Sequence, residues 1–135
     1  MIFIDTGAFI ARHLEHDQHH AKAVTQWQLL SIDNRQCYTS NFVIDEAITF
    51  LARRSTYEFA AVRADAIYKS EELIVLRPDH TDEITALELF GKYSDQSVSF
   101  TDCTSFALMD KLGIKTAFTF DNHFRIAGFT VEPSP

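Results

Sequence analysis

Apolar and polar residues follow one another along the chain in blocks that predict strands and helices in turn. Short apolar runs predict strands at residues 1–5, 37–40, 73–76, 116–120 and 129–131. Longer segments carry apolar residues at the three- and four-residue spacing of a helix with one buried face. They predict helices at 8–12, from Asp17 through Leu30, and at 41–54, 56–70, 80–93 and 100–112. Strands that alternate with helices favour an α/β fold in which helices cover both faces of a parallel sheet.

The length and composition are those of one globular domain, which we expect to span residues 1–135. The chain has 46% hydrophobic residues, three prolines and four glycines, and it shows no repeat or linker. No apolar run approaches the roughly 18 residues of a membrane span, and Asp5 interrupts the first run too early for a secretory signal. Cys37 and Cys103 lack the spacing of a metal site and are typical of buried thiols in a reducing compartment. We therefore expect a cytoplasmic protein with no membrane partner.

The acidic net charge limits the classes of function. Asp and Glu number 19 against 12 Lys and Arg, which gives a formal charge of −7. Proteins that bind nucleic acid by diffuse electrostatic attraction are normally basic, so that class is disfavoured. Two bound divalent cations would add four charges and bring the total to about −3, which weakens the objection.

Four acidic residues lie where an α/β fold brings distant segments together. Asp5 ends the first predicted strand, and Asp121 follows the fourth. Asp102 lies in the first turn of the last predicted helix, and Glu46 lies on the helix at 41–54. The carboxyl ends of parallel strands and the helix starts beside them meet in one crevice. Like charges gathered there need a cation, and Mg²⁺ or Mn²⁺ prefers oxygen ligands, so a metal-dependent phosphodiesterase is the leading hypothesis.

Three of these residues also have an ordinary structural interpretation. Asp5 and Asp121 have the positions of capping or turn residues. Ser99 and Asp102 resemble a capping box with aspartate in place of glutamate, at a helix end where the dipole favours negative charge. The helix behind Asp102 is apolar on nearly all sides and hence buried, so we expect this carboxylate to open into the crevice.

Glu46 can be assigned to one side of its helix. On a helical wheel of about 100° per residue it lies at the rim of the apolar face, whereas Asp45 points toward solvent. A carboxylate partly withdrawn from water needs a partner. That partner is either a bound metal or one of two cations on the same helix, Arg53 and Arg54.

Taken together, these motifs resemble a known family. In chain order they are Ile4-Asp5-Thr6, Thr39-Ser40-Asn41 with Asp45-Glu46, Ser99-Phe100-Thr101-Asp102-Cys103, and Thr119-Phe120-Asp121-Asn122-His123-Phe124 with Gly128-Phe129. Each motif alone is weak, but the ordered set covers essentially the whole chain and is specific. The sequence resembles the PIN-domain ribonucleases, and within them the VapC-type toxins of bacterial and archaeal toxin–antitoxin pairs.

The resemblance implies a fold, a chemistry and partners. It implies a three-layer α/β/α sandwich around a parallel five-stranded sheet, one or two Mg²⁺ or Mn²⁺ ions, and endonucleolytic cleavage of RNA. The family's catalytic and metal-binding positions fall on Asp5, Glu46, Asp102 and Asp121. Thr6, Ser40 and Thr119 would be supporting hydroxyls near the substrate. The resemblance also implies a cognate antitoxin, and we expect a homodimer formed through an apolar helical surface.

Other residues offer weaker candidates for function. Basic side chains that are candidates for substrate phosphates are Arg53, Arg54, Arg63, Lys69 and Arg125, although any one is more often a solvated charge. The run from Arg12 to His20 holds four of the six histidines, but its spacing fits no common zinc site. For His123 a surface or packing role is favoured over a contact with phosphate or a supporting place in the site. For Asp95 a loop role is favoured over a place in the site. The aromatic residues mostly fall at core spacings and are not interpreted as base-stacking surfaces.

Metal-assisted hydrolysis competes with two other hypotheses. The acidic crevice would also suit a non-catalytic metal-binding module that docks a partner. A phosphoacceptor domain using Asp5 is disfavoured, because no lysine lies at a strand end and Lys115 lies at a strand start. Nuclease activity of the purified protein separates the first hypothesis from the other two.

Overall fold

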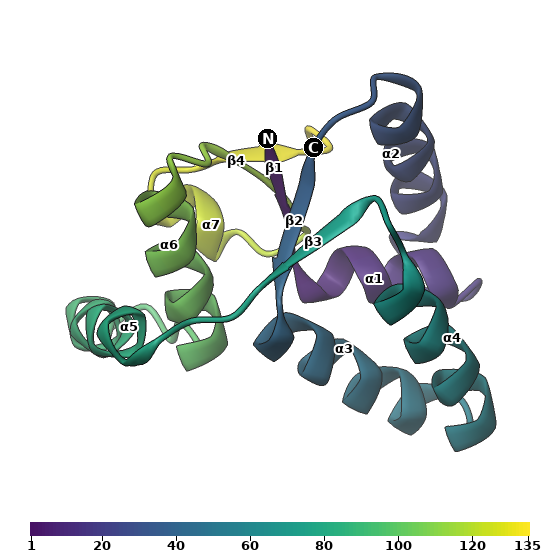
Figure 1. Ribbon diagram of the computed structural model, residues 1–135, viewed down its shortest axis with the longest axis horizontal. Helices are drawn as coiled ribbons and strands as arrows, with labels where there is room; N and C mark the ends of the chain where they lie inside the picture. Colours follow the sequence, from purple (N-terminus) through teal and green to yellow (C-terminus); the bar gives the residue numbers. More distant parts are fainter.

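A parallel sheet of five strands forms the centre of the protein in the computed structural model, which describes residues 1–135 (Figure 1). The strands are β1 (Ile2–Ile4), β2 (Cys37–Ser40), β3 (Leu73–Leu76), β4 (Thr116–Phe118) and β5 (Thr130–Glu132). They lie in the order β3-β2-β1-β4-β5, and every neighbouring pair is parallel. The predicted α/β class and its five-stranded parallel sheet are confirmed.

Helices cover both faces of this sheet. They are α1 (Thr6–His13), α2 (His20–Ile32), α3 (Asn41–Arg54), α4 (Tyr57–Lys69), α5 (His80–Lys92), α6 (Phe100–Leu112) and α7 (His123–Ile126). Figure 1 shows α1 to α4 on one side of the sheet and α5 to α7 on the other. The chain runs from β1 outward to β3 at one edge of the sheet and then returns to β4 and β5 on the other side of β1. Connections between parallel strands are right-handed, so connections that run in opposite directions place their helices on opposite faces of the sheet. None of the helices combines the length and apolar character needed to cross a membrane.

The core fills the space between the sheet and its two helical layers. Its largest fully buried side chains include Phe3, Phe9, Phe106, Phe118 and Phe124. Phe106 packs edge-on against Phe124, with ring centroids 5.0 Å apart. Every residue of α6 from 102 to 109 is buried, which confirms the prediction of a helix apolar on nearly all sides.

Local sequence signals set the ends of the best-predicted helices. α3 and α6 have the predicted bounds, because the Ser40 and Ser99 hydroxyls accept hydrogen bonds from the backbone N–H groups of Val43 and Asp102. Gly113 ends α6 in the left-handed conformation, at φ 70°.

Two local predictions are wrong. Asp17 does not cap the second helix: α2 begins at His20, and Asp17 instead accepts a hydrogen bond from the His19 N–H at 2.8 Å, closing the preceding turn. The strand predicted at 116–120 is too long, because β4 ends at Phe118. The four-residue α7 after it was not predicted, since so short a helix shows no apolar period.

β1 and β4 lie side by side at the middle of the sheet, where the direction of the chain reverses. Ile4 pairs with Phe118, and the Asp5 N–H donates to the Phe118 carbonyl at 3.0 Å. Beyond these strand ends the chain leaves toward opposite faces of the sheet. Open α/β sheets bind their ligands at such a point.

Candidate active site

The four acidic residues predicted from the sequence line one cleft at this point of the sheet. Asp5 follows β1, Asp121 follows β4, Asp102 lies in the first turn of α6, and Glu46 lies in the second turn of α3. The cleft has a volume of about 630 Å³. Asp5 and Asp102 are only 4% and 6% exposed, whereas the Asp121 side chain is 37% exposed. The cleft is thus acidic and deepest at Asp5 and Asp102.

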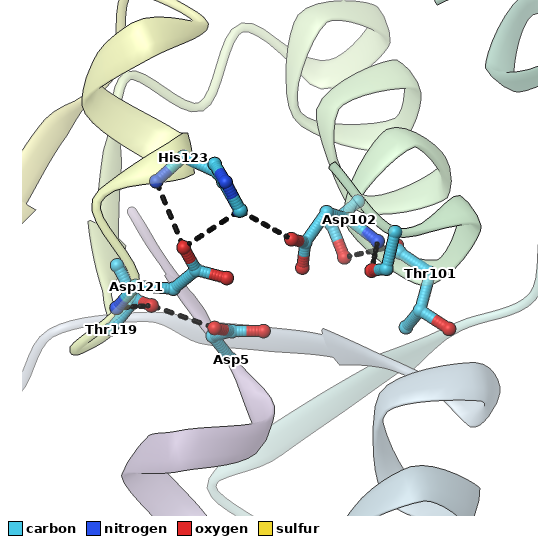
Figure 2. Close-up of polar contacts among 8 residues, drawn as sticks. Asp5, Thr101, Asp102, Thr119, Asp121 and His123 are labelled. Atoms are coloured by element: carbon cyan, nitrogen blue, oxygen red, sulfur yellow. Dashed lines mark hydrogen bonds and ion pairs between the residues drawn. The ribbon is translucent and has the colours of Figure 1, made fainter. Parts of the chain in front are cut away.

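Thr119 connects the Asp5 carboxylate to the backbone of Asp121. Its hydroxyl donates a hydrogen bond to Asp5 Oδ2 at 2.6 Å and accepts one from the Asp121 N–H at 3.0 Å. Thr119 is fully buried. Figure 2 shows this chain of contacts, which fixes the Asp5 carboxylate relative to the loop that carries Asp121.

Asp102 and Asp121 face each other across His123. His123 Nδ1 lies 3.0 Å from Asp121 Oδ1 and 3.6 Å from Asp102 Oδ2 (Figure 2). The backbone N–H of His123 also donates a hydrogen bond to Asp121 Oδ1 at 2.9 Å. One ligand atom from each of these three side chains lies within 4.8 Å of the others, an arrangement that could hold a metal ion. The packing role favoured for His123 from the sequence is therefore incomplete, because its ring also faces the cleft carboxylates.

The electrostatics of the cleft oppose ionisation of its buried carboxylates. Burial, and then the charges of Asp5 and Asp121, raise the pKa of Asp102 from 3.8 to about 9. Burial raises the pKa of Asp5 to about 6 even though the Thr119 hydrogen bond works in the opposite direction. Glu46 adds to both shifts, which places its charge close to both groups. A bound cation would oppose these shifts, because it stabilises the ionised carboxylates.

Glu46 and its neighbour occupy the two sides of α3 that the helical wheel predicted. Glu46 is half-buried and borders the cleft, whereas Asp45 is exposed. The arginines considered as its partners are engaged elsewhere: Arg54 binds Asp17 at 2.9 Å, and Arg53 lies over the Phe50 ring at 6.0 Å. Neither arginine borders the cleft, and their contact with substrate stays a prediction.

The hydroxyl residues differ in how they relate to the cleft. Ser40 is fully buried and caps α3, so it supports Glu46 by positioning that helix. Thr6 borders the cleft, and its buried hydroxyl has no hydrogen-bond partner in the protein. A buried hydroxyl without a partner is costly, which favours a ligand on Thr6. Asp95 is exposed in the turn before α6 and does not border the cleft, as its loop interpretation predicted.

The histidine-rich run contributes one ring to the cleft. His19 borders it and stacks on Phe120, with ring centroids 4.3 Å apart. His20 Nδ1 lies 2.7 Å from the Ala11 carbonyl oxygen. Sequence reasoning missed the place of His19, since its partner Phe120 is 101 positions away in the sequence.

Comparison with known proteins agrees with this geometry. Residues 2–129 match the PIN domain. The chain belongs to the PIN-domain family. It is 38% identical over 138 residues to the 23S rRNA-specific endonuclease VapC20 of Mycobacterium tuberculosis, in strains CDC 1551 and H37Rv, an alignment that covers 100% of this chain and 99% of that protein. This PIN-domain protein also resembles the crystal structure of M. tuberculosis VapC20, described as a sarcin–ricin loop cleaving toxin, with a TM-score of 0.86 and 34% identity over 96% of this chain and 97% of that one.

The likeness to VapC20 confirms the family resemblance inferred from the motifs. It covers nearly the whole length of both chains, so this chain and VapC20 share one fold. The three-layer arrangement expected from the resemblance is likewise the one observed (Figure 1).

Proposed function

We propose that this PIN-domain protein is an endoribonuclease that hydrolyses RNA phosphodiester bonds with Mg²⁺ or Mn²⁺, and that it is the toxin of a toxin–antitoxin pair. The convergence of Asp5, Asp102, Asp121 and Glu46 on one cleft carries the proposal. It is supported by the likeness to VapC20, a 23S rRNA-specific endonuclease. We further propose that residues 1–135 act as a single catalytic domain.

The donor set of the cleft fits a hard divalent cation. Asp5, Asp102 and Asp121 would hold one or two ions, with Glu46 completing the site directly or through water. Carboxylate oxygens are the preferred ligands of Mg²⁺ and Mn²⁺, and the unpartnered Thr6 hydroxyl adds another oxygen. A divalent cation held there would neutralise charge on the scissile phosphate and make water a stronger nucleophile.

The chain's own residues would orient this chemistry. Thr119 fixes the Asp5 carboxylate through its 2.6 Å hydrogen bond, and the backbone N–H of His123 fixes the Asp121 carboxylate through a hydrogen bond of 2.9 Å. These two carboxylates are then held in place before substrate arrives, which lowers the cost of assembling the site. Ser99 and Ser40 contribute by capping the helices that carry Asp102 and Glu46.

The proposed substrate is a structured ribosomal RNA of the large subunit, by similarity to the sarcin–ricin loop cleaving VapC20. With a net charge of −7, the protein has little diffuse attraction for RNA. We infer that it selects RNA by shape and by unstacked bases in loops. Because ribosomal RNA is the proposed target, we also propose a cytoplasmic location.

The proposed partners are a second copy of the chain and an antitoxin. We propose that a homodimer forms through exposed apolar residues on the helices, leaving the cleft open. An antitoxin segment would place an arginine or lysine against the cleft carboxylates, where it would replace the metal. Raising Mn²⁺ should therefore weaken inhibition by the co-expressed antitoxin. An antitoxin affinity indifferent to metal, or a monomer at micromolar concentration in sedimentation, would remove the corresponding part of this proposal.

The test of the activity is cleavage of 23S rRNA by the purified protein. We expect Mg²⁺- or Mn²⁺-dependent cleavage by the wild-type protein and by Asp45→Asn, and none by Asp5→Asn. Asp45→Asn is the matched control because it removes one carboxylate from the solvent side of α3. Metal-induced stabilisation without cleavage of any RNA would favour the non-catalytic binding module instead.

A further inference from the structure

A second hollow adjoins the acidic cleft on the side of β5. It has a volume of about 200 Å³, and the C-terminal segment 133–135 forms part of its wall. The hollow and the acidic cleft share four residues: His19, Phe120, Asp121 and Asn122. The two hollows are therefore adjacent, and a ligand chain that extends beyond the cleft on this side would pass over the shared residues to reach the second hollow.

A flat aromatic pair lies at the junction between the two. The rings of His19 and Phe120 are 4.3 Å apart and inclined by only 2°. Both residues are half-buried. Phe120 is supported from behind by the fully buried Phe118, whose ring meets it at 74° with centroids 6.0 Å apart. Stacking of a nucleic-acid base on such a surface is tolerant of sequence and contributes substantially to affinity.

Two basic side chains border the hollow without a partner in the protein. Lys22 and Arg125 both line it. The salt bridges of lysine and arginine in the protein use Arg35, Arg54, Lys69 and Lys111. Lys22 is the third residue of α2, where the helix dipole disfavours a cation, so helix stability does not account for its place. Two exposed cations beside an aromatic pair give the hollow groups that suit an anionic ligand with a flat ring system.

We propose that this hollow, defined by His19, Lys22, Phe120, Asn122 and Arg125, binds the nucleotide next to the scissile phosphate. The base stacks on the His19–Phe120 pair, and Lys22 and Arg125 hold the outer phosphate. The inference rests on the proposed ribonuclease function and assigns the side of the acidic cleft over which the RNA strand leaves. An acidic segment of a protein partner is the competing occupant, but it would leave the stacked rings unused.

Binding of a sarcin–ricin loop RNA oligonucleotide tests the proposal. Affinity is measured with Mg²⁺ present in an Asp102→Asn background, so that cleavage does not interfere. We expect His19→Ala to weaken binding by about 5- to 100-fold, and His19→Phe, which keeps a flat ring, to restore most of the affinity. Two further oligonucleotides each lack the base on one side of the scissile phosphate, and both should bind weakly. For the oligonucleotide that lacks the stacked base, His19→Ala should have no further effect.

Charge reversal tests the cationic half of the hollow. Lys22→Glu and Arg125→Glu should each weaken binding and reduce the slope of log affinity against log salt by about 1. Lys115→Glu is the matched control, because it changes the net charge equally at an exposed position before β4, outside both hollows.

The outcomes separate this inference from the proposed function. RNA cleavage by the wild-type protein, with affinities unchanged in the His19, Lys22 and Arg125 variants, would overturn the inference and leave the ribonuclease intact. If His19→Ala reduced the affinity for the intact RNA and for both RNAs that lack a base by the same factor, base stacking on His19 would be overturned. If the variants altered only inhibition by the co-expressed antitoxin, the hollow would belong to a protein partner and the inference would fail. Absence of RNA cleavage by the wild-type protein would instead count against the proposed function.

Discussion

The starts of α5 and α6 carry nearly the same acidic motif and put it to opposite uses. In α5, Asp79 and Asp82 form a complete capping box: Asp79 accepts from the Asp82 N–H at 2.9 Å, and Asp82 accepts from the Asp79 N–H at 3.0 Å. In α6, Ser99 accepts from the Asp102 N–H at 3.0 Å, but the Asp102 carboxylate turns to Asp121 and His123 instead of returning to the cap.

Asp82 and Asp102, the third helical residues of α5 and α6, consequently differ in the pKa of their carboxyl groups. Asp82 accepts the hydrogen bond from the backbone N–H of Asp79 and lies 3.1 Å from Lys111 Nζ, and these contacts hold its pKa below its ordinary value. Burial and the neighbouring carboxylates raise the pKa of Asp102 to about 9. The negative charge of a carboxylate that stabilises a fold is balanced by groups of the protein itself. The charge of a carboxylate that binds a cationic ligand stays unfavourable until that ligand binds.

Substituting the two aspartates in the same way should give the largest contrast. Asp102→Asn should reduce RNA cleavage by at least about 100-fold, because it removes a proposed metal ligand. It should leave the metal-free protein as stable as before or more stable, since the neutral amide resembles the protonated acid. Asp82→Asn should lower the melting temperature and leave cleavage unchanged. Equal loss of cleavage in both variants would show that the comparison does not identify the active carboxylate.

The pH dependence of stability should have opposite signs at the two sites. Asp5 and Asp102 have raised pKa values of about 6 and about 9, so the metal-free folded state binds more protons than the unfolded state. Stability should therefore fall as pH rises from about 4 to 9. Asp82, whose pKa is lowered, should lose its contribution only as pH falls below its ordinary value of 3.8.

Thermal melting in EDTA between pH 4 and 9 measures these slopes. Asp102→Asn should flatten the decline above pH 6, where Asp5 no longer contributes. Millimolar Mn²⁺ should raise the melting temperature most at high pH, because the ligands must lose their protons; saturation at 100 times Kd corresponds to about 2.7 kcal/mol. An unchanged slope in Asp102→Asn would contradict the assignment of the raised pKa to that residue.

Glu46 and Asp45 offer a smaller contrast within one helix. Glu46→Gln should reduce cleavage by about 10-fold, because this half-buried residue borders the cleft at its rim. Asp45→Asn should change cleavage by less than about 2-fold, since its carboxylate is exposed on the other side of α3. Steady-state cleavage rates of the two variants decide the matter, and similar losses would show that the helical face of Glu46 has no bearing on activity.

Removing the cation that neutralises Asp82 should have the smallest effect. Lys111 is mostly exposed, and surface ion pairs contribute little to stability. Lys111→Met should lower the melting temperature slightly and make that loss smaller in high salt, because the pair is screened there. Cleavage should not change. A loss of cleavage comparable to that of Asp102→Asn would show that α5 and α6 are coupled to the cleft.

The sequence by itself determined which residues are acidic and where the main elements run. Ser40 and Ser99 mark helix starts and Gly113 marks a helix end, since a cap acts on backbone groups within one turn. Asp5 and Asp121 were located because each follows a short apolar strand, and strand ends of a parallel sheet share one edge.

Only the tertiary structure decided which of these groups meet. The Thr119 hydroxyl reaches Asp5 across 114 positions of sequence, and His19 stacks on a ring from the other end of the chain. Asp82 and Asp102 have similar local motifs, but the carboxylate of Asp82 returns to its own helix cap and meets Lys111, whereas that of Asp102 is buried beside Asp5 and Asp121. The pKa of Asp82 is therefore lowered and that of Asp102 is raised. Desolvation and Coulomb interactions depend on distance in space, which residue spacing along a chain does not record.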